Sequence, residues 1–140
     1  MRVLTYIDPS IASTPIELAA QCRAKLFDVV RSNVDLIRAQ RRKGRPLPSI
    51  YESGVWFTRE PWCGLFEEFA DIATCIRRGW LDCDDACAWR CAEEWDRGNT
   101  DAGIKIYWRP RTDGGLRIFH AQVRLGPGRI EDPSRRLPGG

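Results

Sequence analysis

The chain has 140 residues, with 22 Lys and Arg against 19 Asp and Glu, so its formal net charge is 22 − 19 = +3. A chain of this length is typical of one domain, which buries about two-thirds of its unfolded surface and needs no disulfides to hold a core. The composition, 43% hydrophobic and 29% charged, excludes disordered and fibrous proteins. No apolar run approaches the roughly 18 residues that span a bilayer, and the N-terminus has no signal-peptide pattern. We therefore expect a cytoplasmic protein with reduced thiols and no membrane partner.

The first part of the chain predicts one short strand and one long helix. Residues 3–7 are apolar and typical of a strand. Residues 14–17 combine an N-cap threonine, a proline at the first helical position and a glutamate in the capping-box place. Apolar residues keep near-helical spacing until residues 41–44, a basic last turn followed by glycine. The helix of about 28 residues would be roughly 42 Å long and either pack across the domain or project toward a partner.

The rest of the chain predicts two helices and then an antiparallel sheet. Residues 51–62 are aromatic and β-prone, which indicates a bulged strand or an ordered loop. Helical spacing follows over about 66–78 and 83–96, and alternation then predicts strands over 104–108 and 116–125. Turns are expected at 112–115 and 126–128, and a flexible tail at 138–140. The predicted fold class is α+β, with helices packed on a small antiparallel sheet.

The cysteines do not fit a disulfide framework or a zinc site. A cytoplasmic chain with a core of its own keeps its thiols reduced. Cys83, Cys87 and Cys91 recur every four residues on one predicted helical stripe, without the second ligand cluster that structural zinc requires. The single histidine excludes His-rich zinc sites and two-His iron sites. We therefore expect no metal and no cofactor, and we expect five cysteines to pack in the interior: Cys22, Cys63, Cys75, Cys87 and Cys91.

Cys83 differs from the other cysteines because it is predicted to begin a helix. Gly79 is placed to end the preceding helix, and Asp82 and Asp85 have the spacing of a capping box. A thiol at the first helical position lies at the positive end of the helix dipole, which favours the thiolate. The adjacent Asp84 and Asp85 oppose this effect, so a reactive Cys83 requires an imidazolium partner. The alternative is a buried thiol that only packs at the helix start.

His120, the one histidine, lies in the strand before the last turn, and Asp132 follows that turn. If Leu125 pairs with Arg129, Gln122 faces Asp132 and His120 is its diagonal neighbour; a register tighter by two puts His120 directly opposite. Both registers have the same parity, so His120 and Asp132 share a face of the hairpin. A carboxylate beside an imidazole fixes its tautomer and supports its charged form. A purely structural ion pair is the alternative.

Four segments together resemble a known family. Their sequences are Tyr-Glu-Ser-Gly-Val at 51–55, Gly-Trp-Leu-Asp-Cys-Asp-Asp-Ala at 79–86, Phe-His-Ala-Gln-Val at 119–123 and Ile-Glu-Asp-Pro-Ser at 130–134. Their combination resembles the transglutaminase-like branch of the papain-like cysteine enzymes, in particular the small versions encoded by tailed bacteriophages and prophages. The match covers about residues 47–137, leaving residues 1–46 as an N-terminal strand and helix extension of a single domain, 1–140.

The resemblance implies a Cys-His-Asp triad, with Cys83 as nucleophile, His120 as base and Asp132 as the orienting carboxylate. It implies a transglutaminase-like core and acyl transfer to water, as in a peptidase or amidase, or to an amine, as in a transglutaminase. Phage members imply a second role, as a virion structural or assembly protein at the head–tail junction or tail. The expected partners are a protein substrate or neighbouring virion proteins, in an oligomeric assembly, and the expected location is the host cytoplasm or the virion.

Two further features have competing interpretations. Trp56, Trp62 and Trp80 either line a cleft or pack in the core or an interface, and packing is favoured because tryptophan buries a large area. A basic cluster at the end of the long helix suggests contact with nucleic acid, but a basic last turn also complements the helix dipole and +3 is a modest charge. Nucleic-acid binding is therefore disfavoured for this cluster, which consists of Arg38, Arg41, Arg42, Lys43 and Arg45.

Overall fold

A computed structural model of the chain describes residues 4–7, 14–59, 67–110, 112 and 116–140. It confirms a mixed α+β fold with a small antiparallel sheet. In chain order the elements are β1 (Leu4–Ile7), α1 (Pro15–Arg42), the 3₁₀ helix η2 (Ile50–Glu52), β2 (Trp56–Phe57), β3 (Glu67–Ala70), α2 (Ile72–Arg78), β4 (Trp80–Leu81), α3 (Cys83–Asp96), β5 (Gly103–Pro110), β6 (Leu116–Gly126), β7 (Arg129–Glu131) and α4 (Pro133–Arg136).

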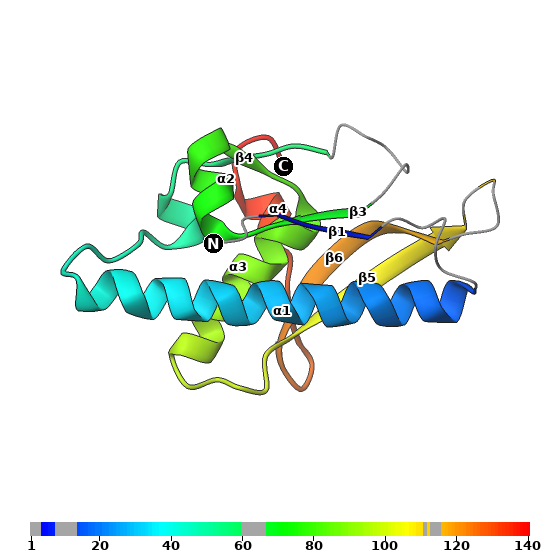
Figure 1. Ribbon diagram of the computed structural model, residues 1–140, viewed down its shortest axis with the longest axis horizontal. Helices are drawn as coiled ribbons and strands as arrows, with labels where there is room; N and C mark the ends of the chain where they lie inside the picture. Colours follow the sequence, from blue (N-terminus) through cyan, green and yellow to red (C-terminus); the bar gives the residue numbers. More distant parts are fainter. Residues whose placement is uncertain (1–3, 8–13, 60–66, 111, 113–115) are drawn as a thin grey trace.

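The long helix α1 has the predicted length and the predicted start. The side chain of Thr14 accepts a hydrogen bond from the Glu17 N–H at 3.1 Å, and Pro15 occupies the first turn. Figure 1 shows α1 running along the long axis of the molecule, with α3 and the β5–β6 ladder against it. Six of its buried side chains form one hydrophobic cluster with residues of α3, β3 and β6; they are Leu18, Cys22, Leu26, Val29, Val30 and Val34. The helix therefore packs across the domain, and residues 15–34 contribute to the same core as the rest of the chain.

The main sheet has the strand order β5-β6-β7, and both pairings are antiparallel. One face is apolar: Ile104 pairs with Val123, Ile106 with Ala121 and Trp108 with Ile118, and these side chains pack with the helices. The neighbouring pair is Tyr107 with His120, and the register shifts there because β6 has one extra residue, Phe119. Beyond this bulge, Arg109 lies opposite Arg117. The bulge therefore puts Arg117 on the same face as His120, which regular alternation does not predict.

The predicted helix over 66–78 is correct only in its second half. Residues 72–78 form α2, but Glu67–Ala70 is a strand that pairs antiparallel with β1, so that Thr5 lies opposite Phe69. Asp71 separates the two elements, because its side chain accepts a hydrogen bond from the Thr74 N–H at 2.9 Å and caps α2. Pairing with a strand about 60 residues earlier is a tertiary effect that local spacing does not reveal.

A separate two-stranded sheet, which is parallel, joins β2 to β4, with Trp56 opposite Trp80. The segment predicted as a flexible tail, 138–140, is held against it: Phe57 N–H donates to the Pro138 carbonyl at 2.8 Å, directly after the buried Leu137. The predicted turn at 112–115, except Thr112, lies outside the described residues, as do Cys63 and Trp62.

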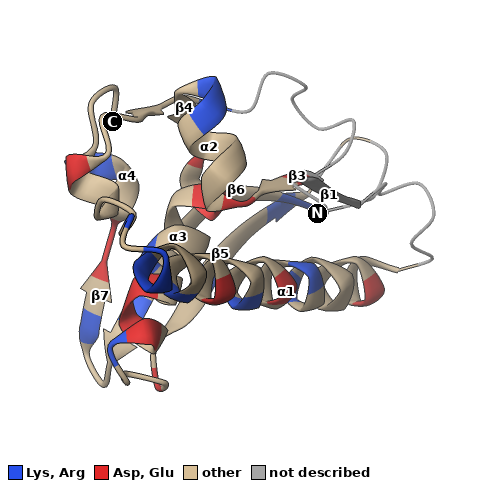
Figure 2. Cartoon of the chain, turned by 60° about the vertical axis from the view of Figure 1, so that its left-hand side comes forward, with Lys and Arg blue, Asp and Glu red and all other residues tan. Residues whose placement is uncertain are grey.

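The basic end of α1 is partly neutralised. Arg38 and Arg41 both form ion pairs with Asp96 at the end of α3, and Figure 2 shows acidic and basic residues interspersed along α1. The described part of the chain therefore carries no continuous basic stripe along this helix. Among the described residues, no helix is long and apolar enough to cross a membrane.

Candidate active site

The start of α3 has the capping structure that its sequence predicts. Gly79 ends α2 in the left-handed conformation, with φ of 81°, which glycine adopts at little cost. Asp82 caps α3: it accepts a hydrogen bond from the Asp85 N–H at 3.2 Å, and the Asp85 carboxylate accepts one from the Asp82 N–H at 3.4 Å. Cys83 is thus the first residue of α3 and is half-buried.

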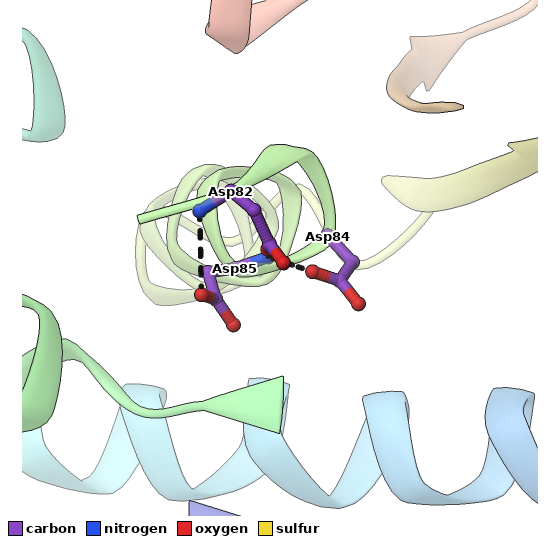
Figure 3. Close-up of side chains that lie close together, drawn as sticks. All are labelled: Asp82, Asp84 and Asp85. Atoms are coloured by element: carbon purple, nitrogen blue, oxygen red, sulfur yellow. Dashed lines mark hydrogen bonds between the residues drawn. The ribbon is translucent and has the colours of Figure 1, made fainter. Parts of the chain in front are cut away.

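Three buried carboxyl groups surround this helix start, as Figure 3 shows, and each offers an oxygen within 4.8 Å of the others. Burial and the neighbouring Asp82 raise the pKa of Asp84 well above its usual value. Asp85 also accepts hydrogen bonds from Arg78 and from the Ala70 N–H, both at 2.7 Å. The hydrogen bonds of Asp82 and Asp85 therefore cap α3 and connect its start to α2 and β3.

The other cysteines of the stripe behave as the sequence predicts. Cys87 and Cys91 are completely buried, Cys87 against Ala121 and Val123 of β6. Burial raises the pKa of Cys87 well above its ordinary value and raises that of Cys91 to about 12. Both are therefore neutral thiols at physiological pH and serve as packing groups.

His120 and Asp132 form the pair that the hairpin predicts. His120 Nε2 lies 2.6 Å from Asp132 Oδ2, and Gln122 Nε2 donates to the same oxygen at 3.5 Å. Val123 lies opposite Glu131, so Gln122 is the neighbour facing Asp132 and His120 is its diagonal neighbour, as in the wider of the two registers. Because Nε2 contacts the carboxylate, Nδ1 is the imidazole nitrogen left to exchange a proton with a thiol.

Asp132 is held in its ionised form. Burial raises the pKa of Asp132, but hydrogen bonds from Ser134 and His120 outweigh burial and leave it below the usual 3.8. The Ser134 hydroxyl donates to Asp132 Oδ1 at 2.6 Å, and Arg135 Nε lies 3.3 Å from Oδ2. An anionic Asp132 in contact with Nε2 fixes the tautomer and the orientation of the His120 ring, which is the role of the carboxylate in a catalytic triad.

The residue before Asp132 anchors the end of β7 to α3. Glu131 accepts a hydrogen bond from Arg90 Nε at 2.9 Å, and it also accepts one from the Tyr51 hydroxyl. Arg136 adds a third contact at 3.2 Å. Because Arg90 belongs to α3 and Tyr51 to η2, these bonds fix β7, and hence Asp132, relative to the helix that carries Cys83.

Cys83 and His120 line the same cleft, which has a volume of about 350 Å³. The apolar part of its wall includes Phe57 and Phe119. The Tyr107 ring stacks against the His120 ring, with ring centroids 6.1 Å apart. Residues from β2, α3, β6 and α4 thus meet at one opening, and the cleft exposes a thiol and an imidazole to the same ligand.

The three residues that the sequence singles out therefore gather at one place, with His120 and Asp132 in direct contact and Cys83 in the same cleft. Sequence reasoning missed Ser134, whose signal is its position two residues after Asp132. It also missed the cleft arginines. Of the tryptophans, Trp56 is 60% exposed and Trp80 is half-buried under the Arg78 guanidinium, and neither is among the lining residues of the cleft.

The chain matches no protein-family model, no curated protein and no solved structure.

Proposed function

We propose that this protein is a cysteine-dependent acyl-transfer enzyme with a transglutaminase-like core, of tailed-phage origin, which acts on a protein substrate. The observation that carries the proposal is the 2.6 Å contact between His120 and Asp132 in a hairpin whose histidine shares a cleft with Cys83, the first residue of a helix. These three residues are the ones we assign as nucleophile, base and orienting carboxylate.

In this mechanism the proton of the Cys83 thiol passes to Nδ1 of His120, and the resulting thiolate attacks the acyl carbon of an amide. Asp132 stabilises the resulting imidazolium. As the C–N bond breaks, His120 returns the proton to the leaving amine, and a thioester remains on Cys83. Water then attacks the thioester to give an acid, or a second amine attacks it to give a new amide, and the thiol is released. The Cys83 backbone N–H, in the first turn of α3, is our candidate donor to the oxyanion.

An activated acyl donor tests this step directly. With p-nitrophenyl acetate, the thiolate displaces p-nitrophenolate, and we expect a burst of nitrophenolate equal to the protein concentration, with acetyl on Cys83 in the mass spectrum. Cys83→Ala should give no burst, and His120→Ala should slow it. Cys75→Ala is the matched control, because Cys75 is a buried cysteine outside the cleft. A burst that survives Cys83→Ala contradicts the proposal.

A structural role in a virion is the second candidate, at the head–tail junction or in the tail. It is favoured by large apolar side chains on the surface, Ile16 at 81% exposure and Trp56 at 60%, which suit contacts with neighbouring subunits. Particles assembled without the protein should then be defective, whereas particles containing Cys83→Ala should be normal. Defective Cys83→Ala particles would favour the chemical role.

A further inference from the structure

The cleft around Cys83 is strongly basic on one side. Four of its lining residues are arginines that come from separate parts of the fold, and Arg135 of α4 is the one that pairs with Asp132. The side chains of the other three form no hydrogen bond or ion pair with a described residue; they are Arg59, Arg109 and Arg117. The acidic residues in the wall are Asp82 and Asp84, which belong to the buried cap of α3.

Two of these arginines lie directly opposite each other. Arg109 of β5 and Arg117 of β6 are cross-strand partners, a placement in which like charges repel and destabilise the sheet. The β6 bulge is what brings Arg117 to this face, next to the pair formed by Tyr107 and His120. An anion bound between the two guanidinium groups would relieve the repulsion and satisfy their donors.

We infer that Arg109 and Arg117 select acidic substrates: the acyl donor carries a carboxylate, as in a Glu- or Asp-containing peptide, that binds these two arginines while its reacting carbonyl meets Cys83. This inference rests on the proposed function for the acyl-transfer step, whereas the binding of an acidic peptide to the two arginines does not require that step. Arg59, exposed at the rim of the cleft, extends the basic surface toward longer acidic chains. The aromatic rings of Phe57 and Phe119 provide the apolar contacts that a peptide backbone and its side chains need.

A pair of alkylating reagents that differ in charge tests the inference. Iodoacetate is an anion and iodoacetamide is neutral, and in both cases the Cys83 thiolate displaces iodide to form a C–S bond. In the wild type at low salt we expect the rate ratio of iodoacetate to iodoacetamide at Cys83 to exceed that of free cysteine by about threefold, because of the nearby positive charges. The ratio should fall toward that of free cysteine in Arg109→Gln/Arg117→Gln, which keeps Arg59 and Arg135, and also in 0.5 M NaCl, where the Debye length is about two to three times shorter than in ordinary buffers.

The matched control is Arg31→Gln/Arg42→Gln, which removes the same two positive charges from α1, outside the cleft. This variant should keep the wild-type ratio. An unchanged ratio in Arg109→Gln/Arg117→Gln, or an equal fall in the control, overturns the inference. Acetylated tetraglutamate should also protect Cys83 from iodoacetamide whereas acetylated tetralysine should not, and equal protection by both overturns it as well.

The two proposals fail in different ways. If Cys83 reacts with iodoacetamide no faster than an ordinary thiol near pH 6, the acyl-transfer function is contradicted. The rate ratio of iodoacetate to iodoacetamide and the protection by tetraglutamate still test whether the two arginines bind an acidic ligand. If Cys83 is reactive but the ratio is that of free cysteine, the acidic substrate class is wrong and the nucleophile remains.

Discussion

The three cysteines of α3 lie on one stripe of one helix, yet they belong to two different environments. Cys87 and Cys91 are sealed against β6 and the neighbouring core, where burial raises their pKa values. Cys83, four residues earlier, faces a cleft that it shares with an imidazole. Cys83 also packs against the edge of these clusters, but it stays half-buried because it is the first residue of α3 and borders the cleft. The same helix thus packs in the core with its later turns and places one thiol in the lining of the cleft with its first residue.

Substitutions in the packed part of α3 should lower the free energy of unfolding far more than a substitution at its first residue. Trp89 lies in the packed part of α3 and is 1% exposed. Trp89→Ala should lower the free energy of unfolding by about 3–5 kcal/mol, because it leaves a large cavity. Cys83→Ala should change it by less than about 1 kcal/mol, since Cys83 is half-buried at the helix start. Urea unfolding of both variants measures the two values, and equal losses would contradict the division of α3.

A smaller effect is expected at the histidine pair and depends on pH. The folded-state pKa of Asp132 lies below its usual 3.8, so ionised Asp132 stabilises the fold above that pH, and this contribution is lost as the pH falls through the folded value. Asp132→Asn should therefore lower the free energy of unfolding by about 1 kcal/mol at pH 7 and by less at pH 3.

Urea unfolding at the two pH values measures this difference. Asp28→Asn is the control: Asp28 forms an exposed ion pair with Arg31, so its loss should cost less than about 0.5 kcal/mol. If Asp132→Asn lowers the free energy of unfolding at pH 7 by no more than Asp28→Asn does, the contact between Asp132 and His120 does not stabilise the fold.

The sequence predicts the elements whose signals are local. The cap at Thr14, the capping box of Asp82 and Asp85, and the shared face of His120 and Asp132 all follow from spacing within a few residues or from one hairpin. The strand Glu67–Ala70 was not predictable in this way, because its partner β1 is far away in the sequence. The same holds for the β6 bulge, since one extra residue changes which side chains share a face without changing the composition of the strand.

The meeting of Cys83 with His120 in one cleft is also a tertiary fact. Periodicity shows that each residue stands at a helix start or on a strand, but the docking of α3 on β6 depends on the complete core. The ties from Arg90 and Tyr51 to Glu131, which fix Asp132 relative to α3, likewise join segments that are far apart in the sequence.

We expect His120 to activate Cys83, and the pH dependence of Cys83 alkylation measures this activation. With iodoacetamide and peptide mapping, Cys83 of the native protein should react at pH 6 about tenfold faster than an ordinary exposed thiol, because an imidazolium partner stabilises the thiolate. Buried Cys87 serves as the unreactive internal reference. In His120→Ala the rate at pH 6 should fall to that of an ordinary thiol. If the wild-type rate equals that of an ordinary exposed thiol, or if His120→Ala leaves it unchanged, then His120 does not activate Cys83.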